Sequence, residues 1–208
     1  MSAAVADFLD TVPAGSEAGD SGDLAAMWSD MARACESDEE ALRAKCAGRS
    51  VEHARCAEDA DTLAAALHGL AAAQRRLPDS DQTAVLAAYD EALDLVDGSE
   101  HPTARGASLY GRAVCLLEGP LADRAAAVAG LEEALDITRT GDDALPRVLV
   151  LGTLAVALHG TDADAASDHW RDAMDTAASV ESAARISVLQ ALAYRVEAAD
   201  ETVWAFLV

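Results

Sequence analysis

Hydrophobic and polar positions follow a helical period over most of the chain. Near the N-terminus, an amphipathic stripe is formed at steps of three, one, three and four residues by Leu24, Met27, Trp28, Met31 and Cys35. A second helical stretch is expected to start at Ser37-Asp38-Glu39-Glu40, with acids in its first turn, and to run to about Leu77, with a candidate break near Gly48. It stops before Pro78, which a helix interior does not tolerate.

From about residue 62 the pattern alternates between two kinds of helix. The A helices are expected over residues 62–77, 103–118, 146–159 and 182–197, and the B helices over residues 81–96, 121–139 and 163–178. The connections are short and carry Pro or Gly, so successive helices are expected to be antiparallel neighbours. Asp79 and Asp162 precede B helices and are expected to cap them.

The B helices repeat one phrase, which reads YDEALDLV at 89–96, LEEALDIT at 131–138 and WRDAMDTA at 170–177. In each copy a bulky residue follows a small one by four positions and precedes an alanine by three. These triplets are Val85/Tyr89/Ala92, Ala127/Leu131/Ala134 and Ala166/Trp170/Ala173. The steps place each triplet on one helical face, where alanine permits close helix approach. We therefore expect the three bulky residues to be buried at equivalent helix joints.

Two A helices add a large residue followed by glycine, Tyr110-Gly111 and Leu151-Gly152. With the B-helix phrase, this pattern resembles the tetratricopeptide repeat (TPR), although the period here is about 40 residues rather than 34 and the proline after helix B is absent. The first A helix also has no Leu-Gly equivalent. The segments HPTARGASLYGRA and LPRVLVLGTLAVAL further resemble the longer TPR-like units found beside caspase-like (CHAT) proteases in bacteria, but no protease domain fits in this chain. The resemblance implies a right-handed α-solenoid of antiparallel helix pairs.

This reading divides the chain into four parts. Residues 1–22 form a short segment and a flexible linker, because residues 11–22 (TVPAGSEAGDSG) are small and turn-forming. Residues 23–61 form N-terminal helices, and residues 62–197 form the TPR-like repeats. Residues 198–208 form an apolar tail or cap that ends in WAFLV.

Composition supports an all-α fold and limits the partners. The chain has 208 residues and is rich in alanine, the best helix former, while aromatic residues make up only 4%. Its net charge of −22 includes a single lysine, Lys45. Codon bias, solubility and adaptation to a salt-rich cytoplasm remain open as reasons for the acidity. Nucleic acid and anionic membranes are disfavoured as partners, since phosphate binding needs clustered Lys and Arg.

The sequence is expected to belong to a soluble cytoplasmic protein with reduced thiols. Its N-terminal stretch lacks the basic region of a secretory signal. The longest strictly apolar window, residues 148–158, is shorter than the ~20 residues of a membrane span. The four cysteines lack the spacing of a disulfide framework or a zinc site.

Candidate chemistry is weak in this sequence. The nearest approach to a metal site is Cys35, Cys46, His53 and Cys56, which would form one stripe if a single helix ran through them. Cys46 and His53 would then lie ~10 Å apart, too far to share one ion, so core packing is the preferred interpretation. His68, His159 and His169 have no nucleophile at triad spacing. No cofactor and no enzymatic activity are therefore expected.

A groove is implied by the resemblance, because A helices line the concave surface of TPR arrays. At groove-facing positions the family pattern selects Arg105, Ser108, Arg112, Cys115, Leu149, Thr153, Val156, Ser187, Ala191 and Tyr194. Arg147 and Arg185 lie near the starts of their A helices and are expected to border the same groove. The A helices carry more arginine than acid, whereas the B helices are strongly acidic.

The expected partner-binding residues are Arg105, Ser108, Arg112, Leu149, Thr153, Arg185 and Tyr194. Arg105 and Arg112 would lie ~10 Å apart on one face, each able to grip a carboxylate of an extended acidic peptide. The alternative for these arginines is that they pair with neighbouring acids.

The preferred function is a non-catalytic protein-interaction module that binds a peptide or partner protein. A self-assembling structural subunit, a homo-oligomer that inserts the WAFLV tail into another copy, is the alternative. A helical enzyme or metal-binding protein ranks third.

Overall fold

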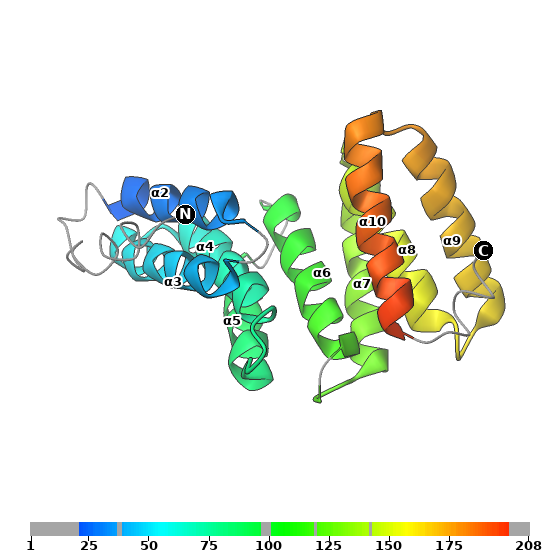
Figure 1. The fold of residues 1–208 in the computed structure, drawn as a ribbon, viewed down its shortest axis with the longest axis horizontal. Helices are drawn as coiled ribbons and strands as arrows, with labels where there is room; N and C mark the ends of the chain where they lie inside the picture. Colours follow the sequence, from blue (N-terminus) through cyan, green and yellow to red (C-terminus); the bar gives the residue numbers. More distant parts are fainter. Residues whose placement is uncertain (1–20, 37–38, 97–100, 119, 142, 200–208) are drawn as a thin grey trace. The chain divides into compact units, whose positions relative to one another are not determined.

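A computed structural model describes residues 21–36, 39–96, 101–118, 120–141 and 143–199 of the chain. Within these residues the fold is all-α, with neighbouring helices packed in pairs (Figure 1). The helices are α2 (Ser21–Ala34), α3 (Glu40–Ala57), α4 (Ala60–Gln74), α5 (Gln82–Leu95), α6 (Pro102–Glu118), α7 (Arg124–Arg139), α8 (Ala144–Leu158), α9 (Ala163–Ala178) and α10 (Ser182–Ala199). The chain divides into two compact units, residues 1–111 and 112–208, and the division falls inside α6.

An aspartate side chain starts many of these helices. Five N-cap aspartates each accept a hydrogen bond from a backbone N–H of the first helical turn, and they are Asp59, Asp81, Asp123, Asp143 and Asp162. Each cap satisfies a donor that has no acceptor inside the helix and places a negative charge at the positive end of the helix dipole. Part of the aspartate excess of this chain therefore has a structural use.

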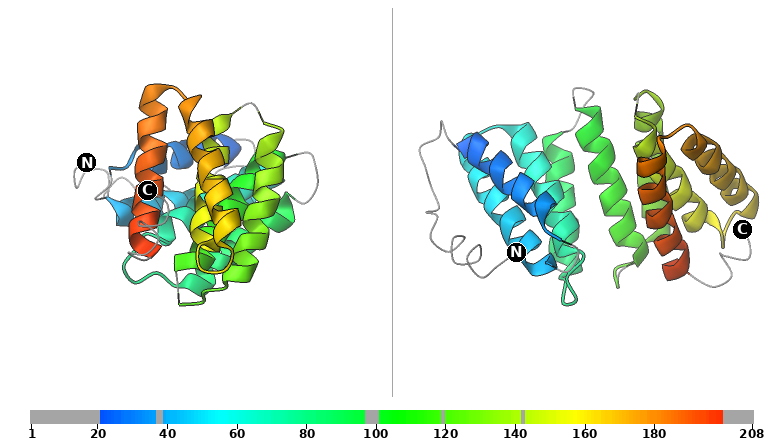
Figure 2. Two further views of the ribbon diagram at one scale, coloured as in Figure 1. Left: turned by 90° about the vertical axis from the view of Figure 1, so that its right-hand side faces the viewer. Right: turned by 45° about the horizontal axis from the view of Figure 1, so that its top comes forward.

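The first unit packs α2 on α3, α3 on α4 and α4 on α5 (Figure 2). Trp28 of α2 is fully buried and packs with Ala32, Cys46, Ala47 and Ala73 from three helices. The small side chains let the three helices close around one large ring, and Met31, Leu42 and Leu70 pack partly buried against the same cluster.

Gly111 allows α6 to pack closely against α5 in the same unit. A Cβ at Gly111 would lie 2.6 Å from the buried ring of Tyr89, closer than atoms pack. The large residue of the repeated phrase in α5 thus needs the glycine that follows Tyr110 in α6.

The second unit packs α8 against α7, α9 and α10. Its core brings Val148 together with Ala177, Val188 and Leu192. Gly152 of α8 faces Leu192, whose side chain would lie 2.5 Å from an added Cβ. The central helix α8 is buried along much of its length, which explains its nearly uninterrupted apolar sequence.

The predicted repeat helices agree with the observed helices to within three residues at each end. The N-terminal prediction was less accurate. α3 continues through Gly48, and the chain breaks at Glu58 instead, which adopts a left-handed φ of 54°. α2 begins at Ser21, inside the predicted linker. Residues 1–20 and the WAFLV tail lie outside the described residues.

Two of the three predicted anchor residues are buried as expected. Tyr89 and Leu131 are 1% and 0% exposed, respectively. Trp170 contacts the core but remains partly exposed. The reason is local, since α10 packs mainly on α8 and covers little of α9.

One of the two predicted N-caps is confirmed, and the other is wrong. Asp162 caps α9 as expected, whereas α5 is capped by Asp81 and not by Asp79.

Candidate functional site

The outer face of α10 exposes large apolar side chains. Val188, Leu192 and Val196 point into the protein and are buried. Ile186 and Tyr194 lie on the opposite face and are 58% and 70% exposed. Their spacing of eight residues places them on one side of the helix. An aromatic ring that is two-thirds exposed gains little from folding, so this face is a candidate contact surface.

A cleft of about 420 Å³ lies beside Tyr194 in the second unit. Its lining comes from the end of α6, the start of α7, the middle of α8 and the end of α10. The lining residues are Leu117, Glu118, Arg124, Thr153, Val156, Ala157, Tyr194 and Arg195. The volume falls within the range of ligand sites.

An ion pair forms one wall of this cleft. The guanidinium of Arg195 donates to Glu118 Oε1 at 2.6 Å, and the two side chains are only 13% and 29% exposed. Arg124 donates to the carbonyl of Ala157 at 2.6 Å, at the last turn of α8. The cleft therefore combines one neutralised arginine with a second that is held by a carbonyl dipole.

Thr153 and Tyr194, two of the predicted site residues, meet in this cleft. Thr153 is buried, and its hydroxyl donates to the carbonyl of Leu149 at 2.7 Å. Leu149 packs partly buried beside the core of the second unit. Arg185 lies in the first turn of α10, half-buried, and is not among the residues that line the cleft.

The remaining predicted residues lie on α6. Arg105 and Ser108 belong to the first unit and Arg112 to the second. Ser108 is buried, and Arg105 and Arg112 are partly exposed and already interact with other groups of the chain. Arg105 and Arg112 both lie on α6.

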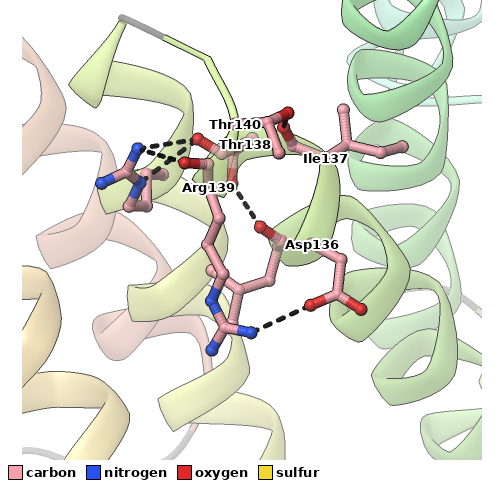
Figure 3. Close-up of polar contacts among 7 residues, drawn as sticks. Asp136, Ile137, Thr138, Arg139 and Thr140 are labelled. Carbon is pink, nitrogen blue, oxygen red and sulfur yellow. Dashed lines mark hydrogen bonds and ion pairs between the residues drawn. The ribbon is translucent and has the colours of Figure 1, made fainter.

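Arg147 closes the end of the preceding helix instead of facing a groove. Its Nε and Nη2 donate to the carbonyl of Thr138 at 3.2 and 2.9 Å, and Nη2 also reaches the carbonyls of Arg139 and Gly141. In Figure 3, dashed lines at the C-terminal turn of α7 mark bonds to the main-chain oxygens of Thr138 and Arg139, while the Arg139 side chain extends to Asp136. The positive charge also suits the negative end of the helix dipole.

Arg43 does the same for α2. Its Nε donates to the carbonyl of Ala32 at 3.3 Å, and its Nη2 donates to the carbonyls of Cys35 and Glu36 at 2.8 and 3.0 Å. Arg43 and Arg147 are each the fourth residue of their helix, and Arg105 and Arg185 hold the same place in α6 and α10. Two of these four arginines, Arg43 and Arg147, thus cap the end of the preceding helix. The sequence pattern did not indicate this role.

Sequence reasoning missed Arg124, Glu118 and Arg195 as cleft residues. Glu118 and Arg195 are 77 positions apart in the sequence, and no periodic pattern links an acid at the end of one helix to an arginine near the end of another. Arg124 follows the Asp123 cap, which marks it only as a first-turn residue.

The cysteine and histidine cluster does not form along one helix. Cys35 follows the end of α2, whereas Cys46, His53 and Cys56 belong to α3. Core packing is confirmed for Cys35, Cys46 and His53, which are buried, and was wrong for Cys56, which is exposed. Burial, together with the neighbouring Cys35 thiol, raises the pKa of Cys46 to about 11, which keeps this thiol protonated.

No protein-family model matches this sequence, and comparison with curated proteins finds no match. In the described part of the chain, no helix is both long and apolar enough to cross a membrane. Within the same residues, His, Cys, Asp and Glu side chains form no group of three that could hold a metal ion.

Proposed function

We propose that this protein is a non-catalytic interaction module, a TPR-like right-handed α-solenoid that binds an acidic peptide segment of a partner protein. The observation that carries the proposal is the cleft beside Tyr194, where an exposed aromatic ring adjoins two arginines. Exposed Tyr and Arg side chains are enriched at the energetic centres of protein interfaces.

The charges of the cleft favour an acidic ligand. A carboxylate of the partner can compete with Glu118 for Arg195, because either carboxylate fits the same guanidinium donors. Arg124 supplies a second cation, which donates to the carbonyl of Ala157. The apolar residues Leu117, Val156 and Ala157 then receive the aliphatic part of the segment.

Support for a non-catalytic role comes from the same lining. Its ionisable side chains are two arginines, one glutamate and one tyrosine, and the arginines and glutamate are already bonded to each other or to the backbone. Such groups suit recognition better than proton transfer or nucleophilic attack. The proposal places the protein in the cytoplasm, which agrees with thiols that are not joined in disulfides.

Selection from a random displayed-peptide library tests this function. Selected peptides should be enriched in Asp and Glu, and the Tyr194→Ala variant should lose most of their binding while its melting temperature stays unchanged. Arg171→Ala removes an exposed arginine of α9 that is paired with Asp168, and it is the matched control. The proposal fails if the selected peptides bind Tyr194→Ala as well as the wild-type protein, or if neutral peptides dominate the selection.

A further inference from the structure

A second cleft, of about 500 Å³, lies in the first unit between α2, α3 and α4. Most of its lining is small, and the small residues are Ser29, Ala32, Ala47, Ala65, Ala66, Gly69, Ala72 and Ala73. Three of these alanines, Ala32, Ala47 and Ala73, also pack against Trp28, so the floor of the cleft is the surface of the hydrophobic core. The floor is therefore apolar, and the hydrophobic core packs directly beneath it.

The rim of this cleft is positive in a strongly negative protein. Arg33, Arg43 and Arg76 line it, and no Asp or Glu is among its described lining residues. The whole chain has 37 acidic residues against 15 basic ones, so three arginines around one opening are a local reversal of charge. Arg33 is paired with the exposed Asp30, and the pair is open to solvent. A low-dielectric cleft of one sign attracts ligands of the opposite sign.

Polar atoms of the lining residues lack partners in the described structure. Arg43 uses Nε and Nη2 to cap α2, but its enclosed Nη1 has no acceptor among the described residues. Nδ1 of His68 is likewise enclosed and unbonded there. An enclosed donor without an acceptor destabilises the folded protein. Arg43, which lines the cleft, therefore keeps one guanidinium nitrogen that the described residues leave unsatisfied.

We propose that this cleft binds a small monocarboxylate with an unbranched apolar body, the carboxylate lying at the arginines and the apolar chain on the alanine floor. The positive charge of the arginines favours the carboxylate of the ligand. The small side chains of the floor leave room for its unbranched apolar chain. The volume falls within the range of ligand pockets. This site is independent of the peptide cleft in the second unit.

Gly69 offers a test that does not depend on unfolding the protein. It lines the cleft in the middle of α4, and a Cβ at this position would meet no heavy atom within 4 Å. The substitution Gly69→Leu therefore adds a side chain that starts from open space at the cleft lining and increases helix propensity. Gly48 of α3 also has open space around an added Cβ but is not among the lining residues, so Gly48→Leu is the matched control.

Isothermal titration calorimetry of the full chain with octanoate measures the binding. We expect saturable one-to-one binding to the wild type and to Gly48→Leu, and none to Gly69→Leu, whose melting temperature should not fall. Acetate, which has the charge without the chain, and 1-octanol, which has the chain without the charge, should each bind more weakly than octanoate. Equal binding of octanoate by Gly69→Leu would overturn the site, and equal binding of 1-octanol would overturn the anionic selectivity.

The arginine rim is tested separately by Arg76→Gln, because Arg76 is exposed and its removal leaves the core intact. The affinity for octanoate should fall by roughly two- to fivefold, the size of one exposed charge pair, and the affinity for 1-octanol should not change. A parallel loss for both ligands would show that charge plays no part in this cleft.

Discussion

At the scale of single residues, the two ends of a helix are stabilised by different side chains. Aspartate starts the helices α4, α5, α7, α8 and α9, and arginine from the next helix covers the ends of α2 and α7. The sequence predicted the Asp162 cap because Asp follows Gly-Thr in a short connection. It misassigned the cap of α5, because Asp79 and Asp81 both stand before that helix and only the structure shows which carboxylate reaches Thr83.

Removing the Arg147 cap should destabilise the protein measurably. Arg147→Ala leaves the carbonyls of Thr138 and Arg139 without this donor, and we expect a loss of about 1–3 kcal/mol in the free energy of unfolding. Urea denaturation gives this value from the midpoint and slope.

Arg139→Ala is the control, because its ion pair with Asp136 is exposed on both sides (Figure 3). It should change the unfolding free energy by less than about 0.5 kcal/mol. If the two variants are equally stable, the cap contributes nothing.

Cys46 and Cys56 should differ sharply in reactivity, although both lie on α3. The pKa of Cys46, near 11, leaves it almost wholly protonated at pH 8, and the side chain is buried. Iodoacetamide at that pH should label Cys56 in the folded protein and reach Cys46 only after denaturation, as peptide mass spectrometry can show. Rapid labelling of Cys46 in the folded state would contradict its burial.

The same pKa predicts a loss of stability in alkali. An acid whose pKa is raised on folding keeps its proton in the folded state while the unfolded thiol, with a pKa of 9.0, loses it. The stability of the wild-type protein should therefore decrease as the pH rises from about 9 toward 11. The stability of the Cys46→Ala variant should decrease less over that range. Thermal melts at several pH values compare the two proteins.

At the scale of helices, the repeated phrase predicted burial correctly for Tyr89 and Leu131 and only in part for Trp170. Spacing identified Tyr89, Leu131 and Trp170 as equivalent, but spacing does not contain the information that α10 leaves α9 partly uncovered. The break between α3 and α4 was missed for a similar reason. Gly48 is the residue that usually interrupts a helix, whereas the left-handed turn at Glu58 gives no signal of its own.

Glycines on different helices should respond oppositely to the same substitution. Gly111→Ala adds a methyl group that overlaps the buried Tyr89 ring, and we expect a loss of about 1–3 kcal/mol in stability. Gly69→Ala meets open space and should gain about 0.5–1 kcal/mol from helix propensity. Chemical denaturation of both variants checks the signs. A stabilising Gly111→Ala would mean that α5 and α6 are not in close contact there.

At the scale of the whole molecule, the all-α class and the alternation of helices could be predicted from periodicity and alanine content. The clefts could not, because each combines residues from several helices whose relative rotation depends on packing. Thr153 and Tyr194 were found through the A-helix pattern, whereas Arg124, Glu118 and Arg195 depend on how helix ends meet.

The net charge of −22 predicts a stability that increases with salt. Raising NaCl from about 0.1 M to about 1 M shortens the Debye length from ~10 Å to ~3 Å, which screens repulsion among surface carboxylates. The melting temperature should therefore rise. Choline chloride should have the same effect if screening is the cause, whereas a rise in NaCl alone would point to specific cation binding.

The arginine caps have a consequence for the rate of folding. Arg43 and Arg147 reach carbonyl oxygens only six to eleven residues earlier in the chain. A loop of about ten residues closes in roughly 10–100 ns, and proteins dominated by such local contacts fold fast. Each pair of helices joined by a cap is thus able to assemble before distant segments meet, and hydrogen exchange should find the amides of α7 and α8 opening together as one cooperative segment.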